Sequence, residues 1–110
     1  MSRTTHDAIV VTYWDESQLK LAHQKAIELG LPVSDLVASS YNGHHSFLIA
    51  PDGSKDGWEP SDRFEAIRAD WKDWVIHQLP HLQWVHVSYD EEYSAQLVDY
   101  AHPPEDDVDE

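Results

Sequence analysis

Two adjacent histidines, His44 and His45, are the residues of this chain whose types most readily suggest chemistry. They lie in the stretch YNGHHSFLIAPDGSKDGW, which runs from Tyr41 to Trp58. Imidazole serves in general acid–base catalysis and is a common metal ligand. A zinc site, however, needs three or four ligands that meet at one point. The question is whether this stretch holds a site or only a turn.

The pair Asn42-Gly43 favours a turn. Asn-Gly is preferred in two-residue hairpin turns, because both positions need a positive φ. The sequence therefore predicts a β-hairpin in which Tyr41 pairs with His44. Neighbouring residues of a strand point to opposite faces, so His44 and His45 would diverge and could not bind one metal ion. No metal site is expected here.

A pocket between the sheet and the following loop remains an alternative. His45 would share the better core face of its strand with Phe47 and Ile49, while His44 would lie on the polar face. A small-ligand binder or an enzyme could use such a pocket. Its candidate ligand-binding residues are Tyr41, His44, His45 and Trp58.

Sequence motifs of the common enzyme classes are missing. The chain has no P-loop, no G-x-S-x-G, no H-E-x-x-H and no dinucleotide fingerprint. It has no cysteine, which fits a reducing, cytoplasmic location. No stretch reaches the roughly 18 apolar residues of a membrane span, so no membrane association is expected. We predict no catalytic residue and no cofactor, and a non-enzymatic role is favoured over an enzyme.

Charge is the strongest compositional signal. The chain holds 21 acidic and 7 basic residues, a net charge of −14. The last basic residue is Lys72, and nine acidic residues follow Tyr89. A negative field repels phosphates, so direct nucleic-acid binding is disfavoured. The same field attracts basic proteins.

The leading hypothesis is therefore a small protein-binding or regulatory module that contacts a basic partner. One version of this hypothesis is an inhibitor whose carboxylates imitate the phosphates of a nucleic acid. The alternative without a binding role is a solvated acidic tail that only aids solubility. The candidate partner-binding residues are Asp90, Glu91, Glu92, Asp99, Glu105, Asp106 and Asp107.

The elements that would position these residues follow from local patterns. A β-rich run predicts a first strand over residues 7–14. Asp15 with Gln18 is typical of a helix start and Gly30 of a helix end, so we expect a helix over Glu16–Leu29. The remaining expected elements are strands over residues 34–41, 44–50 and 82–89, and a helix that begins at Ser61 or Asp62 and ends before Pro80.

This β-α-β-β-α-β order predicts an α+β, ferredoxin-like two-layer sandwich. Its sheet order would be 4-1-3-2 along the chain numbering, with both helices on one face. Residues 1–89 would form this domain, 90–100 a docking helix or an added strand, and 101–110 a disordered acidic tail. The second and fourth strands would be sheet edges. Trp84 and Val85 lie on the fourth, so a homodimer through a sheet edge is a further hypothesis.

Overall fold

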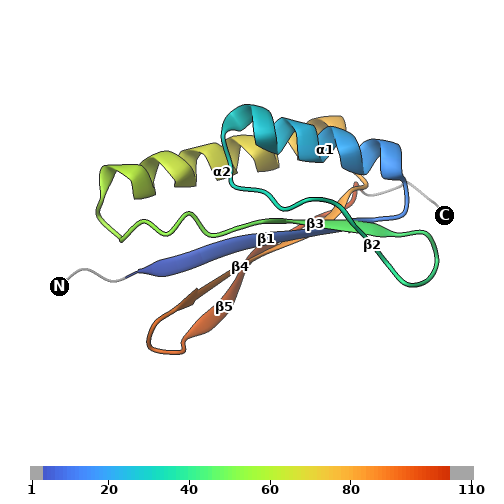
Figure 1. The fold of residues 1–110 in the computed structure, drawn as a ribbon. Helices are drawn as coiled ribbons and strands as arrows, with labels where there is room; N and C mark the ends of the chain where they lie inside the picture. The colour runs from blue at the N-terminus through green and yellow to red at the C-terminus, as the bar shows by residue number, and fades with distance from the viewer. Residues whose placement is uncertain (1–3, 105–110) are drawn as a thin grey trace.

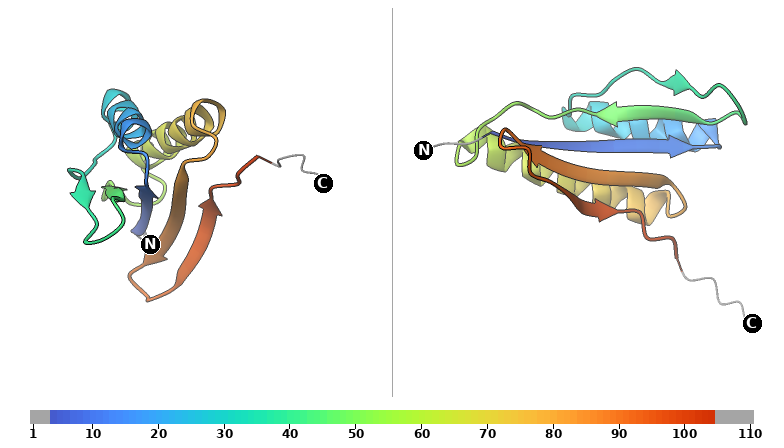
Figure 2. Two further views of the ribbon diagram at one scale, coloured as in Figure 1. Left: turned by 90° about the vertical axis from the view of Figure 1, so that its right-hand side faces the viewer. Right: turned by 90° about the horizontal axis from the view of Figure 1, so that it is seen from below.

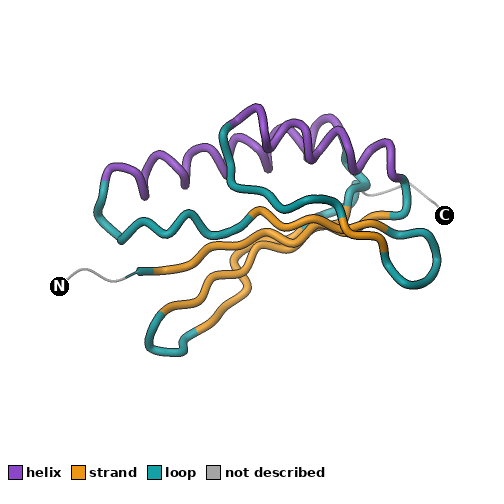
Figure 3. The backbone as a smooth tube through the Cα atoms, in the orientation of Figure 1, coloured by secondary structure: helices purple, strands orange, loops and turns teal. Residues whose placement is uncertain are grey.

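The computed structural model describes residues 4–104, which form one helical layer on one sheet (Figure 1; Figure 3). Both helices lie on the same face of a five-stranded antiparallel sheet (Figure 1). The elements are β1 (Thr5–Tyr13), α1 (Glu16–Leu29), β2 (Val37–Ala38), β3 (His45–Ile49), α2 (Glu59–Gln78), β4 (Gln83–Asp90) and β5 (Ala95–Tyr100). The predicted α+β class is confirmed.

The sheet has the order β2-β3-β1-β4-β5, one strand more than the four expected within residues 1–89. Of the two alternatives for residues 90–100, a docking helix or an added strand, the structure has the strand. β5 pairs with β4 from Tyr89 opposite Ala95 to Val85 opposite Tyr100, with an irregularity between His86 and Val87. The prediction that the fourth strand forms a sheet edge is therefore wrong, and the edges are β2 and β5.

α1 has the bounds that the sequence predicts. The Asp15 carboxylate accepts hydrogen bonds from the backbone N–H groups of Ser17 and Gln18, which have no partner inside the helix. At the other end Gly30 takes a left-handed conformation with φ 88°. The N–H of Leu31 then donates to the carbonyl of Ala26, which closes the last turn.

α2 begins earlier than predicted. Its N-cap is Trp58, whose side chain makes no capping bond, so the expected caps Ser61 and Asp62 are wrong. Pro60 stands in the first turn, where its missing N–H would have had no helical partner. Glu59 adds a negative charge at the positive end of the helix dipole.

The β2–β3 hairpin keeps the predicted turn residues but not the predicted pairing. Asn42 and Gly43 both have positive φ, 69° and 68°. Ala38, however, lies opposite His45, two residues away from the expected register, so Tyr41 does not pair with His44. A shift of two preserves the side-chain alternation, and the predicted faces of the strand therefore survive.

Trp71 of α2 lies at the centre of the core and is fully buried. Its indole N–H donates to the carbonyl of Ala22 at 3.0 Å, which links the two helices. Its ring meets those of Phe47 and Trp84 edge to face, with centroids 6.5 Å and 6.1 Å away. Such pairs add to the free energy gained by burying the ring itself.

Candidate functional site

Of the two adjacent histidines, His44 precedes β3 and His45 is the first residue of that strand. His45 lies on the core side of β3 with Phe47, and its Nε2 atom is 4.0 Å from Oε2 of Glu16. Its buried Nδ1 atom has no hydrogen-bond partner among the described residues. The Glu16 carboxylate, at 4.0 Å, is beyond hydrogen-bond distance, so the described residues supply no hydrogen bond that would orient the His45 ring.

The four predicted ligand-binding residues do not share one pocket. Tyr41 is 81% exposed in the β2–β3 loop, close in sequence to His44 and His45. Trp58 caps the start of α2, at the opposite end of the molecule from that loop (Figure 1). Its ring is half exposed, and the Lys55 ammonium lies 5.7 Å from the ring centroid.

A network of charged side chains, which the sequence analysis missed, lies between α2 and the helix-facing side of β1 and β4. Arg68 and His86 are each only 5% exposed. The Arg68 guanidinium lies 3.5 Å from a carboxylate oxygen of Asp7 and 3.5 Å from one of Asp52. His86 joins the network through its Nε2 atom, 3.0 Å from Asp7, and its Nδ1 atom, 2.8 Å from Lys72.

The hydrogen bonds around His86 specify its tautomer. A lysine ammonium has three donors and no acceptor, so Lys72 donates to Nδ1 of His86. Nε2 then carries the proton and donates it to Asp7. This hydrogen bond lowers the pKa of Asp7 below its ordinary value, against the opposing effect of partial burial, and the nearby Arg68 lowers the pKa further.

The same network also connects β5 to α2. Asp99 of β5 lies opposite His86 of β4, and its Oδ2 atom is 3.4 Å from Nζ of Lys72. The side chain of Lys72 is 16% exposed and that of Asp99 is 38% exposed, so this ion pair is partly shielded from solvent. Lys72 therefore links α2, β4 and β5 at one point.

A cavity of about 210 Å³ borders this network and is lined by Asp7, Glu65, Arg68, Ala69, Lys72, His86 and Val98. Two cations at a cavity could bind an anion, but here both already face carboxylates. The hydrogen-bonding atoms of His86 are likewise both engaged. The arrangement is better suited to holding elements together than to binding or transforming a substrate.

Sequence patterns contain a partial signal for this network. Arg68 and Lys72 stand four residues apart, so a helix presents them on one face. Strand alternation places Asp7 with Ile9 and His86 with Trp84, on the sides that face the helices. No local rule, however, brings β1 beside β4, and the pairing that does so depends on the whole sheet.

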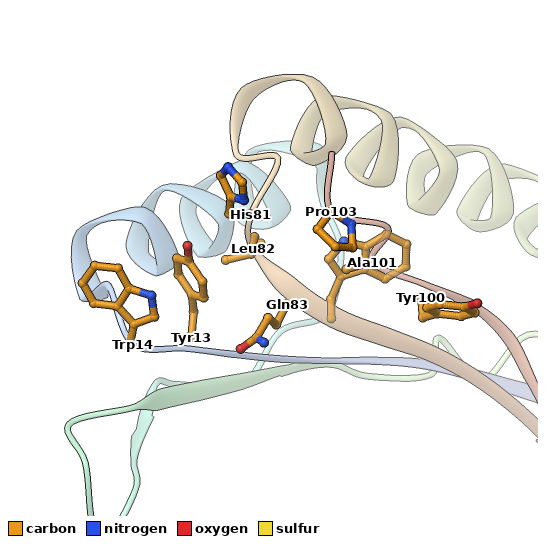
Figure 4. Close-up of a pocket in the computed structure, with 9 residues that line it drawn as sticks. Tyr13, Trp14, His81, Leu82, Gln83, Tyr100, Ala101 and Pro103 are labelled. Carbon is orange, nitrogen blue, oxygen red and sulfur yellow. The ribbon is translucent and has the colours of Figure 1, made fainter. Parts of the chain in front are cut away.

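A second hollow, with several aromatic side chains in its walls, lies at the other end of the sheet (Figure 4). Its volume is about 500 Å³, in the range of small-ligand sites. Figure 4 shows Tyr13 and Trp14 on one side of the opening and Tyr100 and Pro103 on the other. The other lining residues are His81, Leu82, Gln83, Trp84 and Ala101, and none of the nine lining residues that the structure describes is a lysine, an arginine, an aspartate or a glutamate.

The acidic residues of the β4–β5 hairpin have different environments. Asp90 accepts hydrogen bonds from the N–H groups of Glu92 and Ser94, so its carboxylate organises the turn. Glu91 and Glu92 are exposed in this turn, beside Tyr93, which is 97% exposed and has a φ of 66°. Asp99 pairs with Lys72, and the predicted contacts Glu105, Asp106 and Asp107 lie outside the described residues.

The described part of the chain brings no three histidine or carboxylate side chains together as metal ligands. Between residues 4 and 104, neither helix is long and apolar enough to cross a membrane. Comparison with family models, with curated proteins and with solved structures finds no match for this chain. The function must therefore be argued from the surfaces themselves.

Proposed function

We propose that this chain is a non-enzymatic binding module that holds a basic, extended segment of a partner protein along β5. The observation that carries the proposal is the position of β5, the last strand in the sheet order, with a neighbour on one side only. An edge strand offers unpaired backbone groups to which another strand can add. We also propose that β1 to β4, with α1 and α2, form a ferredoxin-like βαββαβ unit that β5 extends.

The charge around β5 supports a basic partner. Glu91 and Glu92 lie in the turn that precedes the strand, and every charged residue after Lys72 is acidic. Lys72 itself is turned toward His86 and Asp99 and is largely buried. A basic segment would therefore meet carboxylates at the start of β5 without facing an exposed lysine there.

The acids of the hairpin support a peptide better than they support imitation of a nucleic acid. A phosphate mimic needs carboxylates at regular spacing along one surface. Asp90 and Asp99 are instead engaged in a turn and in an ion pair. The exposed Tyr93 adds an aromatic contact of the kind enriched in protein interfaces.

Selection from a random peptide library tests the proposed function. The full chain should enrich extended peptides rich in lysine and arginine, and a Glu91→Gln, Glu92→Gln variant should bind them several-fold more weakly. The matched control is Glu28→Gln with Asp70→Asn, which removes the same charge from exposed positions on the helices. Enriched peptides without basic residues, or equal losses in both variants, would contradict the proposal.

A second candidate function is binding of a neutral planar molecule in the hollow of Figure 4. Aromatic side chains surround it, and its lining within residues 4–104 contains no lysine, arginine or carboxylate, so it favours an uncharged aromatic ligand. Titration with indole tests this function when it is followed by the backbone amide resonances of Trp14 and Tyr100 and not by tryptophan fluorescence, to which indole itself would contribute. Shifts that saturate in the wild type and vanish in Trp14→Ala would support it, and unmoved resonances would exclude indole-like ligands.

A further inference from the structure

We propose that the sheet face opposite the helices is the contact surface of a homodimer. Both helices lie on one side of the sheet, so the strands are uncovered on the other (Figure 1; Figure 2, right). Antiparallel sheets of this kind usually carry polar side chains on the solvated face. Here that face exposes Val10 (41%), Leu48 (36%) and Leu97 (57%).

Strand register defines which residues belong to this face. Val10 of β1 lies opposite both Leu48 of β3 and Val85 of β4, and Val87 of β4 lies opposite Leu97 of β5. Opposed residues of an antiparallel pair point to the same side of the sheet. Since the inward positions of β1 and β4 face the helices, these five residues form one apolar strip across four strands, which we call the open strip.

The open strip lies in a sheet face that carries no formal charge. Among the positions of β1, β3, β4 and β5 that point the same way, none is Asp, Glu, Lys or Arg. This is unusual in a chain of which 25% is charged. The polar members of the face are small or neutral, such as Thr12 and Ser46, whose hydroxyls hydrogen-bond to each other at 2.8 Å.

The lack of charge indicates a second copy as the occupant. In a twofold dimer the same patch is used by both subunits, and residues near the axis meet their own copies. A charged residue there would face a like charge. The chain has a net charge of −14, so most contacts between copies would place carboxylates together, and the open strip avoids this. A basic partner, in contrast, would gain no ion pair on this face.

The size and shape of the face agree with a dimer of modest strength. Five strands about 4.8 Å apart, with an average length of about 20 Å, cover roughly 500 Å² on each subunit. Two such faces bury roughly 1,000 Å², near the lower limit for a specific interface. A shallow hollow of about 250 Å³ lies on the face, lined by Val10, Thr12, Gln83 and Val85 together with Trp84, and it would receive side chains of the second copy.

Sedimentation equilibrium of the full chain over a wide concentration range tests this inference. The mass should rise from 12.7 kDa toward twice that value with concentration. Val10→Glu should weaken the dimer by about 100-fold, because it would bury an unpaired charge in the contact. Val10→Lys should do the same although it lowers the net negative charge.

The matched control is Ile76→Glu, which places the same charge on α2 at a site of similar exposure, 48%. It should leave the dimer within about twofold of the wild type, and circular dichroism of each variant confirms that it folds. A wild type that stays monomeric throughout would overturn the inference. So would a dimer that survives Val10→Glu, which would indicate pairing through the β5 edge, or one that Ile76→Glu disrupts equally.

Discussion

Nε2 of His86 lies 3.0 Å from Oδ1 of Asp7, although 79 positions separate the two residues in the chain. The contact joins β1 to β4 on the side of the sheet that faces α2. Arg68 and Lys72 of α2 lie on the helix side of this pair. Arg68 forms an ion pair with Asp7, and Lys72 donates a hydrogen bond to His86. Burying these groups carries a cost in desolvation free energy, which their ion pairs and hydrogen bonds offset.

Removal of the Arg68 charge tests how strongly the network depends on this pairing. Arg68→Met would leave Asp7 and Asp52 without their shared cation, and Asp52 is only 6% exposed at its side chain. We expect the free energy of unfolding to fall by about 3 kcal/mol. Urea denaturation measures this loss.

Arg63 supplies the control for that experiment. It pairs with Glu59 one helical turn away, and both side chains are more than half exposed. Arg63→Met should cost less than about 0.5 kcal/mol, because solvent screens an exposed pair. Equal losses in the two variants would mean that the Arg68 pairs contribute no more than a surface contact.

Asp7 should make the stability depend on pH in the acid range. Its pKa is lowered in the folded protein, so the folded state binds this proton less readily than the unfolded chain. The resulting stabilisation is fully present above the unfolded pKa of about 4 and is lost as the pH falls through the lowered value. Wild type should therefore exceed Asp7→Asn in stability at pH 7, with a gap that narrows below about pH 4. A gap that stays constant down to pH 2 would contradict this role of the carboxylate.

Asp99 should determine how firmly β5 is attached. Asp99→Asn removes the charge that faces Lys72 but leaves a side chain of the same size. We expect faster amide exchange in Ala95–Tyr100 with little change in β1 and β3, because local opening of an edge strand needs no global unfolding. Uniformly faster exchange across the sheet would show that β5 does not open on its own.

Gly30 offers a test of the α1 terminus. It has a φ of 88°, a conformation that costs a residue with a Cβ more than it costs glycine. Gly30→Ala should lower the free energy of unfolding by about 1 kcal/mol. The ideal Cβ at this position meets nothing within 4 Å, so a larger loss would indicate a cause other than the backbone conformation.

Local signals predicted the parts of the fold that local interactions stabilise. α1 is bounded by Asp15 and Gly30, whose effects act within a few residues, and its predicted range is the observed one. The start of α2 was mispredicted because Ser61 and Asp62 are good caps, whereas Pro60 allows the helix to begin before them. The capping preferences of individual residues do not by themselves decide which of these positions begins the helix.

Long-range pairing accounts for what the sequence did not reveal. Residues 90–100 lack a clean strand alternation, and β5 depends on its neighbour β4 and on the contact between Asp99 and Lys72. The network around His86 needs β1 and β4 side by side before any of its distances can arise. Of the predicted ligand-binding residues, His45 was correctly assigned to the face of β3 that holds Phe47 and Ile49, because the alternation survives an error of two in register.

We propose above that the edge of β5 away from β4 receives a basic segment as an added strand. Amide exchange of the labelled full chain, with and without a selected lysine-rich peptide, tests it most directly. We expect slower exchange of amides within Ala95–Tyr100 on binding, and loss of binding when the ionic strength is raised to about 0.5 M. Protection confined to α1 or α2, with β5 unchanged, would contradict the claim.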